Sequence, residues 1–389
     1  MHALLLAVFA LLLNQALGHR FDRPSFHNST KCVKKIQRKP WQALTAIEKS
    51  SYINATLCLT QKPAKHGIPG ARTLWDELHY VHVYQSPYIH FTGSFLPFHR
   101  YYLAAHTKLL TTECNYRGAM PYWNQPLDLP LPNLTTSPIF HPTTGFGGNG
   151  SPPSNCVTTG PFSSLRLIYT ENATLVSSPY CLARNFSACL FANTAQANVD
   201  ACLEAPTYET MWRCLEAKPH IAAHWGVGGT MGNSLLSAGD PVFFLHHGWL
   251  DSLWWRWQLR GKNGERLREV GGGNLASGGP LGGLLGGGGG GQGQGQGWNG
   301  TRPVEGGPSG GMNGTDGGAC APPLGGGGLA AIAHGAGKGL NRAITDWFGD
   351  GGGNVTTLGH VLWSAGILPN ATVADIMDVG GKVFCSEYL

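Results

Sequence analysis

The pattern of apolar and polar positions is most pronounced in residues 239–258, which read GDPVFFLHHGWLDSLWWRWQ. Asp240 followed by Pro241 is typical of a helix start, because the carboxylate can accept from free backbone N–H groups and proline lacks the N–H that would be unpaired there. The apolar run that follows predicts a helix buried on most sides. His246 and His247 lie inside this run. Burying an imidazole costs free energy unless its nitrogens are satisfied, so either a metal ion or ordinary hydrogen-bond partners are implied.

Two more helices are predicted upstream. Residues 40–59 form one amphipathic pattern. Thr73 is a good N-cap for the next helix, with Asp76 three residues further on. One face of that helix carries Leu74, Leu78, Val81 and His82. The His82 side chain therefore lies on the same face of the helix as the apolar residues. His79 lies about one turn earlier on the flank of the same face, and spacing alone leaves it a rival of His82.

A loop carrying His90 leads into the sequence FLPFHR at 95–100, where the proline can open a helix that runs to about Glu113. His99 and His106 lie along one stripe of this helix. The helical rise places them roughly 10 Å apart, so one metal ion cannot bind both. We interpret His106 as a hydrogen-bonded core or surface histidine.

Residues 121–207 are rich in Pro, Gly, Ser, Asn and Cys and have little periodicity, which predicts long loops stapled by disulfides. A helical pattern returns at 208–218, is interrupted or restarted by Pro219, and continues through His220 and His224. An i,i+4 histidine pair shares one helical face, and a helix can offer two ligands to one ion in this way. The glutamate of the zinc-protease motif HExxH is missing here.

Glycine dominates residues 271–328, which cannot bury enough apolar surface to fold. Residues 355–379 predict two short helical pieces that return to the core. The expected organisation is a signal peptide at 1–18, a core at 19–270, a flexible glycine-rich insertion at 271–328, and a C-terminal segment at 329–389 that packs back on the core.

The composition indicates a secretory route. Residues 3–13 are an unbroken apolar run, and the small-residue pattern at 16–18 suits signal peptidase. Ten cysteines and ten N-x-S/T sequons indicate disulfides and N-glycans. Only 13% of residues are charged and the net charge is +5, so we interpret the basic cluster at 31–39 as a solvated face. We expect a secreted, extracellular glycoprotein that binds neither nucleic acid nor a membrane.

The histidines form two sets. His82, His90 and His99 lie upstream, and His220, His224 and one of the adjacent pair lie downstream. Helix bundles build metal sites from facing helices, and ligation by imidazole alone suits copper well and zinc also. Two facing sets without a bridging carboxylate predict a copper pair that binds dioxygen. The predicted fold is mainly α, with a central antiparallel four-helix bundle that holds a dicopper site inside long disulfide-stapled loops.

These residues resemble the type-3 copper family of tyrosinases, catechol oxidases and hemocyanins, and in particular its short, secreted fungal-type tyrosinases. The resemblance covers about residues 31–260 and 341–389. The segments that carry it are His82, HFTGSFLPFHR at 90–100, PYW at 121–123, HIAAH at 220–224 with Gly228 and Gly229, DPVFFLHH at 240–247 with Asp251 and Trp254, and the stretch from TTLGH to NATVADIMD at 356–378.

The resemblance implies a ligand set. It assigns one copper to His82, His90 and His99, and the other to His220, His224 and His247. His246 is then a neighbour, and no catalytic residue beyond the ligands is expected. Asp251 is either a partner that orients a ligand or a carboxylate on the helix surface. Arg100 is expected to pair with a buried carboxylate.

The reaction implied by the resemblance is oxidation of o-diphenols to o-quinones with reduction of O2 to water. It also allows weak monophenol hydroxylation and o-aminophenol oxidation. Ile221 stands where monophenol-hydroxylating members often have Asn, which favours diphenol oxidation. Tyr88 stands where some members have a cysteine linked to the histidine two residues on, so no such link is expected. Ser234 stands where some members have a bulky gate, which predicts an open entrance.

Two other classes are considered. A reversible dioxygen carrier of hemocyanin type is the alternative, but such carriers are large assemblies with shielded copper, and no covering domain is evident here. A zinc hydrolase built on the downstream pair would leave the upstream set unused. We therefore expect a type-3 copper oxidoreductase whose partners are small phenols and O2. The sequence does not determine the oligomeric state.

Overall fold

The computed structural model describes residues 32, 34–274, 349–351, 353–381 and 383–389. The predicted signal peptide and most of the predicted glycine-rich insertion lie outside these residues. The α-helices are α2 (Ala46–Leu59), α3 (Leu74–Ile89), α4 (Phe95–Glu113), α5 (Ala188–Phe191), α6 (Gln196–Leu203), α7 (Tyr208–Leu215), α8 (Ile221–Val227), α9 (Val242–Leu259) and α12 (Val373–Ile376). The π-helix η7 (Glu216–His220) joins α7 to α8.

The remaining elements are short. The 3-10 helices are η2 (Trp41–Ala43), η3 (Gln125–Asp128), η4 (Leu134–Thr136), η5 (Pro138–Phe140), η6 (Ala192–Thr194), η8 (Ser237–Gly239) and η9 (Lys262–Arg268). The strands form four two-stranded pairs: β1 (Ile36–Arg38) with β8 (Ser386–Tyr388), β2 (Gly150–Ser151) with β3 (Cys156–Val157), β4 (Arg166–Tyr169) with β5 (Leu175–Cys181), and β6 (Val361–Leu362) with β7 (Ala371–Thr372). Among these four pairs, β1 and β8 run parallel, in the register Ile36 to Ser386.

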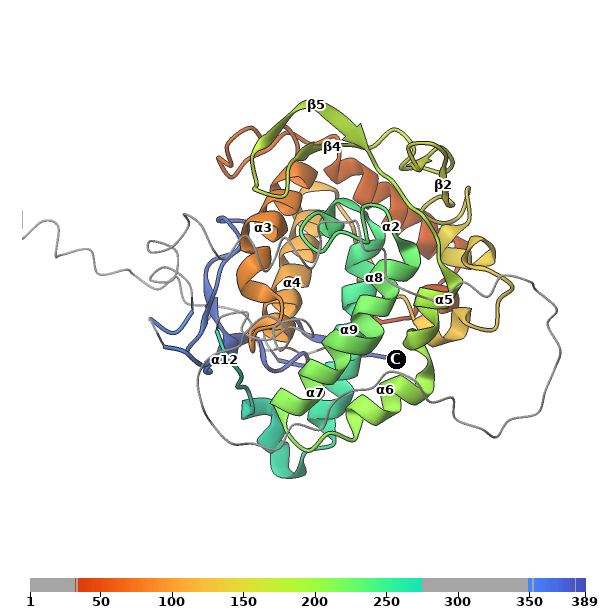
Figure 1. The fold of residues 1–389 in the computed structure, drawn as a ribbon. Coiled ribbons are helices and arrows are strands. Elements are labelled where there is room, and N and C mark those ends of the chain that lie inside the picture. The colour runs from red at the N-terminus through yellow and green to blue at the C-terminus, as the bar shows by residue number, and fades with distance from the viewer. Residues whose placement is uncertain (1–31, 33, 275–348, 352, 382) are drawn as a thin grey trace, which may run out of the picture.

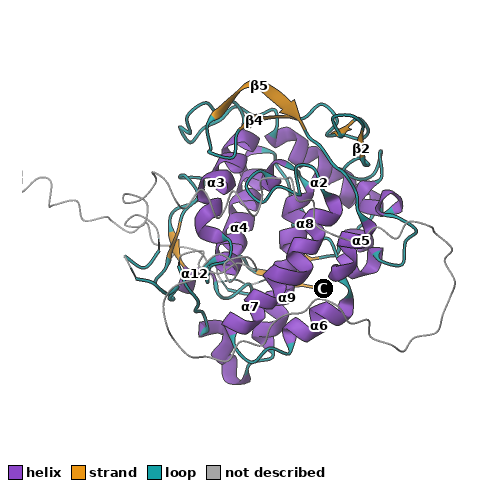
Figure 2. Ribbon diagram, in the orientation of Figure 1, coloured by secondary structure: helices purple, strands orange, loops and turns teal. Residues whose placement is uncertain are grey.

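Helices form the centre of the molecule and loops with short strands surround them (Figure 1 and Figure 2). α4 packs on both α3 and α9, and the β4–β5 hairpin covers α3. The core between these helices is aromatic, with Trp75, Trp249 and Trp254 all at most 1% exposed. The predicted mainly α fold class is confirmed.

The predicted start of α3 is confirmed in detail. The Thr73 hydroxyl accepts from the Asp76 N–H, and the Asp76 carboxylate accepts from the Thr73 N–H, which is a full capping box. α9 begins at Val242, one residue later than its sequence indicates, so Pro241 and not Asp240 is the N-cap. The Asp240 carboxylate still accepts from the Val242 N–H, at 3.0 Å. The same carboxylate forms a fully buried ion pair with Arg184, which anchors the long loop region to α9.

Three expectations need correction. The helix expected at 40–59 begins only at Ala46, where Thr45 caps it, and 3-10 helix η2 precedes it. The two helical pieces expected at 355–379 are one short helix, α12, preceded by the β6–β7 ribbon. Residues 271–274, at the start of the predicted insertion, are held in place. The Gly93 N–H donates to the Gly273 carbonyl at 2.9 Å, and Asn274 donates to Asp350 at 3.0 Å.

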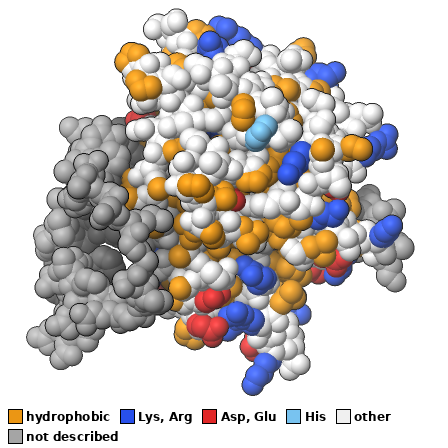
Figure 3. Space-filling view, turned by 90° about the vertical axis from the view of Figure 1, so that its right-hand side faces the viewer, with side chains coloured by type: hydrophobic (Ala, Val, Ile, Leu, Met, Phe, Trp, Pro, Cys, Tyr) orange, Lys and Arg blue, Asp and Glu red, His pale blue; other side chains and the backbone are white. Residues whose placement is uncertain are grey.

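Disulfides join segments that are far apart in the sequence. The four bonds with both partners described are Cys32–Cys385, Cys58–Cys114, Cys156–Cys181 and Cys202–Cys214. The first lies beside the β1–β8 pair and fastens the end of the chain to its beginning. No cysteine in the described ranges is free. Charged side chains are scattered over the face shown in Figure 3, as the low charged fraction leads one to expect.

Candidate metal centre

The upstream histidines meet at the junction of α3 and α4. His82 lies on α3, His90 is the residue that ends this helix, and His99 lies in the first turns of α4. The three ring centroids are 5.3 to 5.7 Å apart. The chain turns sharply after His90, where Phe91 has a φ of 56°. A non-glycine residue rarely adopts this conformation, and it returns the chain so that His99 faces the other two.

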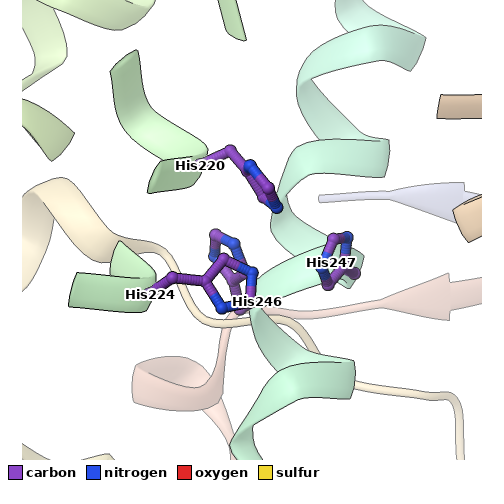
Figure 4. A group of neighbouring side chains, drawn as sticks. All are labelled: His220, His224, His246 and His247. Atoms are coloured by element: carbon purple, nitrogen blue, oxygen red, sulfur yellow. The ribbon is translucent and has the colours of Figure 1, made fainter. Parts of the chain in front are cut away.

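The downstream histidines come from the η7–α8 segment and from α9 (Figure 4). The ligand atoms of His220, His224, His246 and His247 lie within 4.8 Å of one another, as do those of the upstream three. The predicted i,i+4 pair does share a face, with ring centroids 4.5 Å apart. Pro219 is accommodated because the backbone widens into a π-helix just before His220.

Backbone carbonyls orient most of these rings. His99, His90 and His220 each donate from Nδ1 to the carbonyl four residues earlier, at 2.7, 2.9 and 3.3 Å. His82 and His224 instead donate to the segment between α8 and α9, to Leu235 at 3.1 Å and Met231 at 2.7 Å. An imidazole that donates from Nδ1 keeps the Nε2 lone pair free, which is the usual arrangement of a metal-binding histidine.

Burial keeps the rings neutral. Desolvation lowers the pKa of His90 to about 4 and of His224 to about 3. It also lowers the pKa of the other five well below its usual value, with smaller contributions from neighbouring histidines. These five are His82, His99, His220, His246 and His247. A neutral imidazole is the form that binds a metal, so the centre is ready for one across the physiological pH range.

The Nε2 atoms are the strongest indication of a metal. Buried Nε2 atoms without any hydrogen-bond partner occur in His82, His99, His220, His224, His246 and His247. So many unpaired buried nitrogens facing one small volume would be costly in the absence of a ligand. Because every donor is an imidazole, the set fits copper and, less specifically, zinc.

His246 and His247 differ in their partners. The Gln125 amide donates to His246 Nδ1 at 2.7 Å, which leaves the proton of this neutral ring on Nε2. Neither nitrogen of His247 has a partner. Its ring stacks on His99 at 4.0 Å between centroids and so links the two histidine sets.

Two other buried histidines, His79 and His106, lie outside the two sets. His79 donates from Nε2 to the Leu236 carbonyl at 3.1 Å. The prediction that His106 is hydrogen-bonded was wrong. It is fully buried, neither ring nitrogen has a partner, and the ring stacks on Phe244 at 3.9 Å.

Asp251 takes neither of its expected roles. It is only 3% exposed, so it is no surface carboxylate, and none of its contacts is a candidate ligand. It forms an ion pair with Arg100 Nε at 2.5 Å, a second with Arg38 at 3.5 Å, and it accepts from the Tyr388 hydroxyl. The expectation that Arg100 pairs with a buried carboxylate is confirmed.

Glu216 is a site residue that the sequence analysis missed. Glu216 is 1% exposed, and its carboxyl group accepts from the Phe91 N–H at 2.7 Å, so it joins the loop after His90 to the helix that carries His220. Burial raises its pKa well above the usual value. Glu216 was not recognisable in sequence, because a glutamate one turn before a histidine resembles any helical surface residue.

A cavity of about 30 Å³ opens on the histidines and is lined by His90, Phe91, His220, Ile221, His224, Trp225, Gly232 and Ser234. Ile221 and Ser234 therefore lie where the sequence analysis expected them. The volume holds a few water molecules. A small residue at 234 does not by itself open the entrance, since Phe91 and Trp225 also line it.

Two facing sets of neutral, buried imidazoles on a helical scaffold are compatible with a dinuclear metal centre. The model of the common central domain of tyrosinase matches residues 72–260. Tyrosinase ustQ from Aspergillus flavus is 34% identical over 251 residues, 61% of this chain and 68% of that protein. The tyrosinase-like protein phomQ1 from Diaporthe leptostromiformis is 33% identical over 260 residues, 61% of this chain and 65% of that protein, slightly under two thirds.

Two further relatives extend the comparison. The N-acetyl-6-hydroxytryptophan oxidase ivoB from Emericella nidulans is 30% identical over 293 residues, 60% of this chain and 79% of that protein. A polyphenol oxidase from Thermothelomyces thermophila shares the fold, with a TM-score of 0.62, 23% identity, and coverage of 91% of this chain and 89% of that chain. The chain belongs to the tyrosinase family, and its similarity to a tyrosinase and to an oxidase indicates an oxidoreductase. This membership implies a type-3 dicopper site.

Proposed function

We propose that this protein is a secreted dicopper oxidase that converts o-diphenols to o-quinones. Two diphenols and one O2 give two quinones and two waters, so electrons and protons balance. The copper pair, when bound, supplies the redox chemistry by passing electrons from the diphenol to O2. The observation that carries the proposal is the set of buried, unpartnered Nε2 atoms in two facing groups.

The proposed ligands are His82, His90 and His99 for one copper and His220, His224 and His247 for the other. For the second copper, His247 is favoured over its neighbour because the Gln125 hydrogen bond leaves the proton on Nε2 of His246. The alanine variants of these two residues test the assignment. H247A is expected to lower the copper content from two ions per chain to one, and H246A to keep two. The reverse pattern would move the assignment to His246.

The chain's own residues orient the site. Carbonyl acceptors fix the ligand rings, and Glu216 holds the Phe91 backbone beside the cavity. Ile221, which lines the cavity, has no polar atom with which to orient a water molecule as a base. We therefore infer oxidation of diphenols in preference to hydroxylation of monophenols. The name of the relative ivoB, an oxidase of a hydroxylated tryptophan, supports a hydroxylated aromatic substrate.

Oxygen uptake by the copper-loaded protein tests the activity. We expect rapid uptake with a catechol and slow uptake with the matching monophenol. I221N is expected to raise the ratio of monophenol to diphenol turnover at least about tenfold, because a positioned base contributes that much or more. I221V is the matched control and should leave the ratio unchanged. Reversible O2 binding without catechol oxidation would replace the proposal with an oxygen carrier.

Secretion is part of the proposal. The four disulfides support an oxidising compartment. Among the residues described, no helix is both long and apolar enough to cross a membrane. We also propose the division into a signal peptide at 1–18, a catalytic core at 19–270, a glycine-rich insertion at 271–328 and a C-terminal segment at 329–389. Expression of the whole chain with N-terminal sequencing of the secreted product tests the first boundary.

A further inference from the structure

Three consecutive carbonyl groups in the segment between α8 and α9 accept hydrogen bonds from a single helix. The acceptors are the carbonyl oxygens of Ser234, Leu235 and Leu236, and the respective donors are Ser86 Oγ, His82 Nδ1 and His79 Nε2, each at 3.1 Å. The donors are spaced at i, i+3 and i+7, so they share one face of α3. We call these three bonds the α3 ladder.

The ladder fixes one wall of the cavity beside the histidines. Ser234 and Gly232, from the segment that the ladder holds, line the cavity. The side chain of Asn233 accepts from the N–H groups of Leu235 and Leu236, at 3.0 and 3.2 Å. The segment is therefore a tight turn held from both sides, with the N–H groups of Leu235 and Leu236 bound by Asn233 and its three carbonyls accepting from α3. The Leu236 carbonyl also accepts from the Gly239 N–H at 2.9 Å, and the Ser234 carbonyl accepts from the Ser237 hydroxyl at 3.5 Å.

The ladder contains one of the proposed copper ligands and contacts a second. His82 supplies its middle bond, which leaves Nε2 of that ring free for copper. Ser86 supplies another, and the His90 ring lies against Ser86, 2.9 Å from its carbonyl oxygen and 3.0 Å from its hydroxyl oxygen. A displacement of the segment would therefore shift the entrance to the cavity and the acceptor that orients His82 at the same time.

His79 is the histidine of the ladder that is not a proposed ligand. It is 1% exposed, and desolvation lowers its pKa to about 4, so the ring is neutral and has a single N–H. That N–H is the one given to Leu236, and Nδ1 has no partner. A Cβ on Gly239 would lie 3.2 Å from the His79 ring, so the segment packs closely on it. Burying an apolar side chain at this position would cost less free energy than burying a histidine. We therefore attribute the role of His79 to its hydrogen bond with the Leu236 carbonyl.

We propose that His79 is a positioning residue that holds the 234–236 segment in register with His82 and so determines the entrance to the copper centre. The inference rests on the proposed oxidase function only for its kinetic consequence. The structural consequence, an ordered 234–236 segment, does not depend on the substrate or on copper.

The test compares three variants of the full chain. H79F keeps a ring of similar size without the donor, H79Q keeps an N–H donor, and H106F removes another fully buried histidine that has no hydrogen bond. Hydrogen exchange of the amides at 232–238 is measured on the copper-free proteins. KM and kcat for an o-diphenol are measured on the copper-loaded proteins, and a thermal melt verifies that each variant is folded.

We expect H79F to speed exchange at 232–238 about tenfold and to raise KM at least about fivefold, with kcat within about twofold. H79Q should restore both properties to within about twofold of the unmodified protein, and H106F should change neither. Unchanged exchange in H79F, or an equal effect in H106F, would overturn the proposal. If the unmodified protein oxidises no diphenol, the proposed function fails, and the exchange measurement alone decides the role of His79.

Discussion

Replacing Asp251 by asparagine should destabilise the fold severely while leaving the copper centre intact. Asp251 is the carboxylate partner of two buried guanidinium groups, those of Arg100 and Arg38, whose side chains are 0% and 5% exposed. Removing the charge of one partner of a buried pair costs about 3–5 kcal/mol, because the remaining charge is left uncompensated in a medium of low polarity. Arg100 keeps some partners, since it also donates to the Met377 carbonyl at 2.7 Å and lies 3.7 Å from the Trp254 ring centroid. We therefore expect a loss near about 3 kcal/mol.

The assay is urea unfolding of the copper-free protein with its disulfides intact, so that metal binding does not contribute to the measured free energy. E209Q is the control. Glu209 forms an exposed i,i+4 pair with Arg213, and its loss should cost less than about 0.5 kcal/mol. The copper content of folded D251N should stay at two ions per chain. A loss below about 1 kcal/mol, or a loss of copper at unchanged stability, would refute this reasoning and return Asp251 to a ligand-orienting role.

Three further predictions concern stability, each measured by unfolding of the copper-free protein. Burial lowers the pKa of His106 to about 3. The unfolded chain therefore takes up a proton near pH 6.5 that the folded chain does not, and stability falls as the pH drops from 6.5 towards 3. H106F should reduce the slope of the free energy of unfolding against pH by up to about 1.4 kcal/mol per pH unit. Equal slopes for the variant and the unmodified protein would contradict the prediction. Replacing both Cys58 and Cys114 by serine removes a disulfide that spans 56 residues and should lower the free energy of unfolding by about 4 kcal/mol. An unchanged free energy of unfolding would contradict this prediction. Gly228 has a φ of 66°, and an added Cβ would lie 2.3 Å from the Asn185 carbonyl oxygen. G228A should therefore cost at least about 2 kcal/mol, and a fully stable variant would show that the turn can relax.

Several features of the site followed from local patterns. Thr73 with Asp76 marked the start of α3, and the spacing of His220 and His224 placed both rings on one face. Such features depend on residues within a few positions of each other, so they form regardless of how distant segments pack. The segment 361–372 shows the limit of this approach. Its periodicity indicated a helix, but its residues form the β6–β7 ribbon, because pairing and burial against distant segments override a weak local preference.

By itself, the sequence determined which segments are helical around the centre and which histidines they carry, since capping and apolar periodicity are local properties. Only the tertiary structure decided the environment of each side chain. It placed Gln125 on His246, Asp251 between two arginines, and Glu216 beside the loop after His90. These partners lie more than 100 residues apart in the chain. Burial and hydrogen bonding between such partners depend on how the helices pack, and no local pattern encodes that packing.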